Sequence, residues 1–149
     1  MIPELIFLII CAAAIVYATR AIYLGYKSGS WPSVQGEILS SELHTSWSRL
    51  GPRYEPQVFY RYTVDRQTFN GYRLAFGIHD YSIFGEAIAA GIVRDHPTGS
   101  LTLIHYDPAQ PRRSILLPGI RIHPILELLF WGGLAGLIGH DLWRSLTSP

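Results

Sequence analysis

The sequence is poor in residues that form covalent cross-links or metal sites. Its 149 residues include a single cysteine, Cys11, so no disulfide can form within the chain, and zinc sites built from several thiolates are excluded. The six histidines lack the HxxxH spacing that places two ligands on one element. A GxSxG nucleophile elbow and a glycine-rich phosphate loop are also missing. We therefore expect no metal ion and no cofactor, and the sequence names no catalytic residue.

Charged residues are scarce and nearly balanced. They make up 15% of the chain, with a formal net charge of +1, whereas soluble domains carry about 25%. Near-neutrality argues against a nucleic-acid-binding surface, although aromatic residues are frequent in the middle of the chain. The hydrophobic content of 48% is ordinary, so the apolar residues must be concentrated in particular segments.

Two apolar runs lie at the ends of the sequence. The first, "LIFLIICAAAIVYAT", continues after Arg20 as "AIYLGY", and the second covers residues 122–142. Each is long enough for a membrane span of about 20 residues. The first run is preceded by "MIPE", which has an acid where a signal peptide has basic residues. We therefore expect a retained anchor, and the two runs together predict an antiparallel pair of transmembrane helices.

One charge on each expected helix falls at a similar depth. Arg20 and Glu127 each lie six or seven residues inside the domain-side end of a span, which corresponds to about 10 Å of helix. Ionisable groups at such depth are treated as functional candidates with a named partner, and the two residues are each other's obvious partner. The alternative is that both side chains reach the headgroups separately. We expect either an ion pair between Arg20 and Glu127 or two independent interfacial charges.

The second run also contains small residues at helical spacing. Gly132 and Gly136 form a GxxxG pair, and Ala135 and Gly139 repeat the spacing. Small residues allow close approach of another helix backbone. We expect this face to pack against the chain's own first helix rather than to form a dimer.

The middle of the chain has the alternating patterns of a small β domain. In "PQVFYRYTV", Val58, Tyr60, Tyr62 and Val64 share one face by period two. "DRQTFNGY" predicts a reversal, after which "YRLAF" returns as a strand. An amphipathic pattern around Phe84, Ile88 and Ile92 predicts a short helix, and "SLTLIHY" predicts a further strand whose inner face carries either Leu101, Leu103 and His105 or the intervening residues.

Residues 41–56, "SELHTSWSRLGPRYEP", show no regular pattern and are expected to form a loop. The loop carries Trp47 beside Arg49 and Arg53, and tryptophan and arginine are enriched at binding hot spots. Contact with a partner protein and simple packing of the loop are equally compatible with this composition.

The last soluble stretch, "HYDPAQPRRSILLPG", can be explained as scaffolding. Asp107-Pro108 initiates a turn, and the following residues form a short extended edge that leads to the second span. Arg112, Arg113 and Arg121 are expected near the lipid headgroups.

Several of these motifs together resemble a bacterial membrane-protein family known as domain of unknown function 3592. The resemblance rests on Trp31 with "VQGEI", on "YEPQVFYRYTV" followed by Asn-Gly and "YRLAFG", and above all on "GSLTLIHYDPAQPRRSILLPG". It covers residues 31–119, and the two flanking apolar runs match the plan of that family. The resemblance implies a membrane-anchored small β domain and supplies no catalytic residues.

We expect an α+β membrane protein in which two transmembrane helices, an antiparallel hairpin, flank a β-rich domain. The domain should contain about five mainly antiparallel strands and one short helix. The expected boundaries are residues 1–27 for the first helix, 28–119 for the domain, 120–143 for the second helix and 144–149 for a short tail.

The function that we expect is non-enzymatic: contacts with other membrane-protein subunits, as an accessory or assembly subunit in the bacterial cytoplasmic membrane. Basic residues near the span ends favour a cytoplasmic domain by the positive-inside bias. Two alternatives stay open. One is a homo-oligomeric transport or pore protein that uses Glu127, and the other is an enzyme whose His79, Asp80, His96 and His105 meet only in three dimensions.

Overall fold

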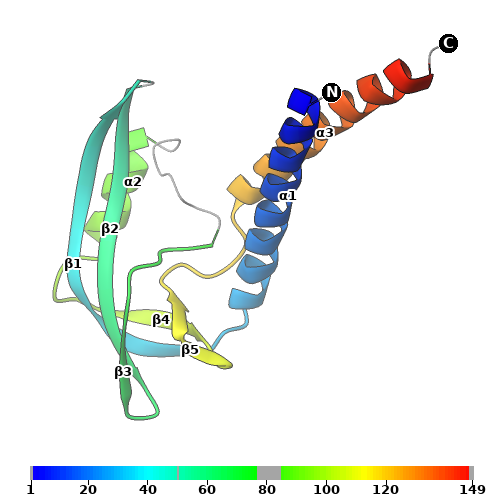
Figure 1. The fold of residues 1–149 in the computed structure, drawn as a ribbon. Helices are drawn as coiled ribbons and strands as arrows, with labels where there is room; N and C mark the ends of the chain where they lie inside the picture. The colour runs from blue at the N-terminus through cyan, green and yellow to red at the C-terminus, as the bar shows by residue number, and fades with distance from the viewer. Residues whose placement is uncertain (1, 50, 77–84, 148–149) are drawn as a thin grey trace.

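The computed structural model describes residues 2–49, 51–76 and 85–147. Two long helices, α1 (Ile2–Ser28) and α3 (Ile122–Thr147), lie side by side and run antiparallel (Figure 1). Between them the chain forms a five-stranded antiparallel sheet and the short helix α2 (Gly85–Asp95). The expected plan of two long apolar helices flanking a small β-rich domain with one short helix is confirmed.

Both long helices have the length and composition of membrane spans. The candidate spans are Leu5–Ser28 and Ile122–His140, with mean hydropathies of 2.3 and 1.5. Most of their apolar side chains are exposed around the helix pair, which is the arrangement that lipid rather than water favours.

The face of α1 that packs on α3 consists of small residues. Cys11, Ala18 and Gly25 recur every seven residues, and Ala14, Ala21 and Ser28 fill the alternate positions. All except Ala14 are buried. A repeat of small residues with 3- and 4-residue steps lets two helix backbones approach closely, so this face of α1 holds the helix pair together.

The sheet has the strand order β3-β2-β1-β4-β5. Its strands are β1 (Ser33–Ser48), β2 (Gly51–Val64), β3 (Gln67–Gly71), β4 (Leu101–Asp107) and β5 (Gln110–Ile115). The first two strands form a hairpin that is much longer than the other strands. We call residues 33–38 and 58–64 the hairpin base, because β4 and β3 pair with the ribbon at that end. We call residues 45–49 and 51–54 the hairpin tip, where β1 and β2 pair only with each other.

The reversal after β2 is tighter than the sequence suggested. Asp65 and Arg66 both have positive φ, 50° and 66°, which is the backbone of a two-residue turn that matches the twist of a hairpin. The returning strand therefore begins at Gln67, and the prediction that "YRLAF" forms it is wrong. Asn70-Gly71 ends that strand instead, and Gly71 lies so close to the Tyr60 ring that a Cβ atom would clash with it.

The core lies between the hairpin and α2. The predicted inward row on β2 is confirmed, since all four of its side chains are buried. On β4 the intervening residues face inward: Ile104 is buried, whereas Leu101 and Leu103 are exposed. On α2 the buried residue is Ala89, with Ile92 packed beside the core and Ile88 exposed. Of the expected helical pattern, Phe84 lies outside the described residues.

The domain is fastened to the helix pair where the chain enters and leaves it. The Ser28 hydroxyl donates to the Gly25 carbonyl at 2.7 Å and accepts from the Gly119 N–H at 3.1 Å. Trp31 packs edge-on against Phe76, with ring centroids 5.7 Å apart, and both contact the cluster that includes Ile115. We call these contacts the joint. Because Ser28 is fully buried there, the first helix and the domain are held together by packing as well as by the chain.

Candidate functional site

The segment expected to be a loop contains the hairpin tip. Ser48 pairs with Gly51, Trp47 with Pro52 and Ser46 with Arg53, so the prediction of an irregular loop over residues 41–56 is wrong. The physical reason is that both faces of a two-stranded ribbon can meet solvent, which removes the alternation of apolar and polar residues that marks a half-buried strand.

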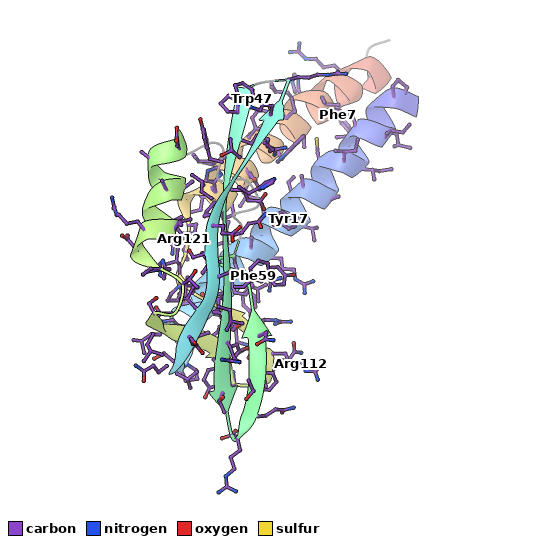
Figure 2. The ribbon with its side chains drawn as sticks, turned by 90° about the vertical axis from the view of Figure 1, so that its left-hand side faces the viewer. Phe7, Tyr17, Trp47, Phe59, Arg112 and Arg121 are labelled. Atoms are coloured by element: carbon purple, nitrogen blue, oxygen red, sulfur yellow. The ribbon has the colours of Figure 1, made fainter. Side chains whose placement is uncertain are left out.

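The hairpin tip separates the three residues expected to bind a partner. Directly paired residues share a face of the ribbon, so Trp47 lies on the face of Pro52, and Arg53 lies on the opposite face with Ser46. Trp47 is 82% exposed at the end of the hairpin (Figure 2), Arg49 is exposed in the connection, and Arg53 is half-buried. Trp47 and Arg49 therefore form the protruding end, and Arg53 does not extend the Trp47 surface.

Helix α2 covers one face of the hairpin up to the residues just before Trp47. Tyr54 pairs with Thr45, two residues before Trp47, and its phenol interacts with the carboxylate of Glu86 in the first turn of α2. Partial burial and then the carboxylate of Glu86 raise the pKa of Tyr54. The row of residues on this face of the ribbon thus runs from Leu43 and Tyr54, which pack beside the core, to Trp47, which does not.

The two charges expected to pair inside the membrane are not paired in the described part of the chain. Its ion pairs do not include one between Arg20 and Glu127. Arg20 is exposed, because at roughly 100° per residue it is turned about 100° from Ala21 and 200° from Ala18 on the packing face. Glu127 is half-buried on the side of α3 that carries the half-buried Trp131. Pairing stays a prediction, and the exposed position of Arg20 agrees better with separate contact with headgroups.

The glycines of α3 do not pack against α1. A Cβ atom added at Gly132, Gly136 or Gly139 would meet no described atom within 4 Å. Ala135 and Gly139 are half-buried, whereas Gly132 and Gly136 are exposed. The close approach that we expected from this stripe is instead made by the small residues of α1, so the GxxxG pair faces away from the helix partner within the chain.

The histidines expected in an assembled catalytic site have structural surroundings where they are described. His96 Nδ1 donates to the Ile92 carbonyl at 2.8 Å near the end of α2. His105 Nδ1 lies 3.5 Å from the Trp31 carbonyl. His79 and Asp80 lie outside the described residues. Within residues 2–49, 51–76 and 85–147, no group of three or more His, Cys, Asp or Glu side chains could hold a metal ion.

The Tyr-Asp-Pro turn is held by Asp107, which is buried. One carboxylate oxygen accepts from the Ala109 N–H at 3.0 Å, and the other accepts from Arg113 at 3.3 Å. These bonds hold the turn between β4 and β5 in place, as expected, and the Arg113 side chain forms an ion pair within the domain.

The polar contacts that close the sheet were not among the sequence-based expectations. The Tyr60 hydroxyl donates to the Arg73 carbonyl at 2.9 Å and lies 3.2 Å from the Ser114 hydroxyl. The Tyr62 hydroxyl donates to the Pro111 carbonyl at 2.6 Å. These bonds join β2 to β5 across the core. A tyrosine row on a buried face was the available signal, because a buried phenol needs a partner.

Comparison with known proteins places the chain in a family. No curated protein and no solved structure matches it significantly. One family model matches residues 34–121, from the start of β1 to the residue before α3. The matched region covers more than half of the chain and contains α2, the Tyr-Asp-Pro turn and all of the sheet except Ser33. On this match, the chain belongs to the family described as Domain of unknown function (DUF3592).

Proposed function

We propose that this chain is a non-enzymatic, two-span membrane protein whose β-rich domain contacts another subunit of a membrane complex. In this proposal α1 and α3 anchor the protein in a bacterial cytoplasmic membrane, and the hairpin tip is the contact. The protein would act as an accessory or assembly subunit rather than as a catalyst.

The observation that carries this proposal is the placement of Trp47. Its ring is 82% exposed at the far end of a sixteen-residue strand, and a large exposed aromatic beside an arginine is typical of interface anchors. The hairpin rises from the base of the domain towards the same side as the helix pair (Figure 1). A neighbouring subunit in the same membrane would therefore lie within reach of the tip.

The joint supports the proposal because it limits how the tip can move. Ser28, Gly25 and Gly119 are in direct contact, so the domain cannot swing freely on a linker. Contact residues on a rigid element lose less conformational entropy on binding than residues on a flexible loop. A partner would meet Trp47 at a defined position relative to the helix pair.

Photo-crosslinking in native membranes tests the proposal. A photoreactive phenylalanine analogue is placed at position 47 and, as a matched control, at Thr63, which is exposed on β2 at the hairpin base. We expect a discrete protein adduct from position 47 and none from position 63. The adduct partner should also co-purify with the wild type and be lost from Trp47→Ala/Arg49→Ala. If both sites give the same adducts, or position 47 gives none, the tip is not a protein contact.

The orientation rests on the basic residues at the domain side of the spans, which favour a cytoplasmic domain. Both termini would then face the opposite side. A C-terminal phosphatase fusion should be active, and a C-terminal fluorescent-protein fusion should be dark. The reverse pair of signals would place the domain outside.

A homo-oligomeric transport protein is the second candidate, and Glu127 is the observation that favours it. Glu127 is half-buried on α3 and takes part in none of the described ion pairs, and an unpaired acid within a membrane span is costly unless it serves a polar path. Native mass spectrometry of the detergent-extracted protein separates the candidates. A homo-oligomer that persists in wild type and is lost in Glu127→Leu would favour this second function, whereas a complex with a different chain would favour the first.

A further inference from the structure

The outer edge of β1 is covered at the hairpin base and uncovered towards the tip. β4 pairs with this edge at the base, and just beyond it the Ser41 N–H donates to the Thr98 hydroxyl at 3.1 Å. Among the described residues, no strand pairs with the outer edge of β1 past Ser41, and none pairs with the outer edge of β2 before Tyr60. We call residues 43–47 of β1 the free edge.

Two prolines of β2 show which backbone groups of the free edge point away from the hairpin. Proline has no N–H, so a residue paired with it cannot exchange two backbone hydrogen bonds with it. Pro52 pairs with Trp47, and Pro56 pairs with Leu43. The backbone groups of these pairs therefore point outward, and by period two those of Thr45 do so as well. The outward N–H that donates to the threonine hydroxyl at the base fits the same alternation.

One long edge of the hairpin is therefore blocked and the other is open. On β2, the outward positions at Pro52 and Pro56 offer no N–H donor, which prevents continuous pairing with another strand. On the free edge, the outward groups are the N–H and C=O of Leu43, Thr45 and Trp47. Natural sheets commonly protect an exposed edge with proline or lysine, and the free edge, "LHTSW", contains neither. It is a template for one more strand.

The side chains of the free edge define the chemistry of a strand that pairs with it. Leu43 packs beside the core on the face that α2 covers, and Trp47 continues the same row with its ring in solvent. On the opposite face, His44 pairs with Glu55 and carries no apolar neighbour across the ribbon. An added strand that matches both faces has apolar and polar residues in alternation, with its apolar side chains beside Trp47.

We propose that an extended, proline-free segment of a different subunit pairs with the free edge of β1 and continues the sheet. The inference rests on the proposed contact at the hairpin tip and states its form. Main-chain hydrogen bonds to the outward groups give the added strand its affinity, and the pocket beside Trp47 selects its alternate side chains. Trp47 is then the side-chain part of a contact that is mainly made by the backbone.

A second copy of this chain fits the free edge less well than a different chain. The hairpin runs alongside α1 and α3 (Figure 1). Two identical strands that pair antiparallel are related by a half-turn about an axis perpendicular to them. Such a half-turn would make the helices of one copy run opposite to those of the other. Copies inserted into one membrane with the same orientation cannot pair in that way, which favours a segment from another protein.

A proline at position 45 tests this form of contact. Because the Thr45 N–H points outward, Thr45→Pro removes a donor from the free edge and leaves the ladder between β1 and β2 intact. Thr45→Ala keeps the N–H and is the matched control. Each is combined with the photoreactive phenylalanine analogue at position 47 in native membranes. We expect Thr45→Pro to lower the yield of the partner adduct at least about tenfold, and Thr45→Ala to change it by less than about twofold.

Hydrogen exchange of the wild-type protein gives a second reading, which decides the matter if Thr45→Pro does not fold. The backbone amides of residues 43, 45 and 47 should exchange several-fold more slowly in the co-purified complex than in the chain alone. The Tyr54 amide is the control, because it points outward from the blocked edge of β2 and should exchange equally in both.

The outcomes separate this inference from the proposed function. An adduct that survives Thr45→Pro, or unchanged exchange at the free edge in the complex, would overturn the inference and leave a contact made by the Trp47 side chain. Slow exchange that appears on concentrating the chain alone would also overturn it, because a second copy would then occupy the free edge. If position 47 gives no adduct without a change at position 45, the proposed contact fails and this inference fails with it.

Discussion

The base and the tip of the β1–β2 hairpin belong to one ribbon, yet their surroundings differ in almost every respect. At the base, β3 and β4 pair with the outer edges of the ribbon, and Tyr60 is completely buried. At the tip, β1 and β2 pair only with each other, and Trp47 is 82% exposed. An isolated two-stranded ribbon is only marginally stable, so the tip keeps its shape because the base is fixed.

The difference indicates where substitutions should affect folding and where they should affect contacts. Backbone segments approach one another closely at the base, where Gly36 and Gly71 leave no space for a Cβ atom. Large side chains at the tip have few neighbours and contribute little to the free energy of unfolding. Three of the four predictions below test this division and one tests the joint, beginning with the largest expected effect.

Gly36→Val should destabilise the domain most. A Cβ atom there would lie 2.6 Å from Ile104 Cγ1 and 2.7 Å from the Arg61 carbonyl oxygen, and the backbone oxygen cannot move without breaking the β1–β2 ladder. Overpacking of this kind costs about 3 kcal/mol. Thermal unfolding of the detergent-solubilised chain measures the loss. Gly91→Ala on α2, where the nearest atom is 3.9 Å away, should instead be neutral or stabilising; equal losses in both variants would contradict the idea of a crowded base.

Tyr60→Phe should cost about 2 kcal/mol, because it removes two hydrogen bonds from the core, one of them with the buried Ser114 hydroxyl. Burial is also the main reason that the pKa of Tyr60 is strongly raised. The unfolded phenol loses its proton near pH 10, whereas the folded one keeps it. Stability contributed by this group is therefore complete below pH 10 and falls above it by up to about 1.4 kcal/mol per pH unit.

The dependence of stability on pH in the alkaline range tests the expected direction of this effect. Denaturation measured between pH 9 and 11 should show a shallower decline in Tyr60→Phe than in wild type. Some decline should remain, because burial also raises the pKa of Tyr62. An unchanged slope would mean that Tyr60 is not buried in the folded protein.

Gly25→Leu should weaken the joint by about 1 kcal/mol, because a Cβ atom at Gly25 would lie 3.0 Å from the Gly119 carbonyl oxygen. The matched change on α3, Gly136→Leu, enters open space and should leave thermal stability unchanged. Protease cleavage near residue 120 in nanodiscs reports the opening of the joint directly. Faster cleavage in Gly136→Leu than in Gly25→Leu would reverse the assignment of the packing face.

Trp47→Ala should change the free energy of unfolding least, by under about 0.5 kcal/mol, since the ring is mostly in solvent. Its effect should appear only in the crosslinking and co-purification of a partner. A loss of stability comparable to that of Tyr60→Phe would show that Trp47 packs within the chain, and the base and the tip would then not differ in the way described.

Parts of the fold with one buried and one exposed face were predictable from sequence. The period-two row of β2 and the extent of β4 are visible because water lies on one side of each strand. The tip was missed because water lies on both sides, and β3 was misplaced because no sequence rule assigned Asp65 and Arg66 to positive φ. The packing face was predicted on α3, where Gly132 and Gly136 are conspicuous, and not on α1, where Cys11, Ala18 and Gly25 recur at a seven-residue spacing.

Less of the candidate site was predictable. Trp47 and Arg49 were identified by residue type, but the pairing register alone separates them from Arg53. The exposed apolar side chains on the sheet face opposite α2 are divided among β2, β4 and residue 72. Such a surface depends on which strands become neighbours, and local pattern carries no information about that order.

The hydrogen bond between Ser28 and Gly119 has a consequence for how such a protein could diversify. The chain leaves the first helix at Ser28 and approaches the second at Gly119, and these two residues are in contact. The ninety residues between them therefore form an insertion whose two ends lie side by side. Insertions with adjacent ends are tolerated because they add no length to the path they interrupt. A short turn could replace this insertion and leave a hairpin of two helices. An unrelated domain could also be inserted between Ser28 and Gly119 without repacking the helices.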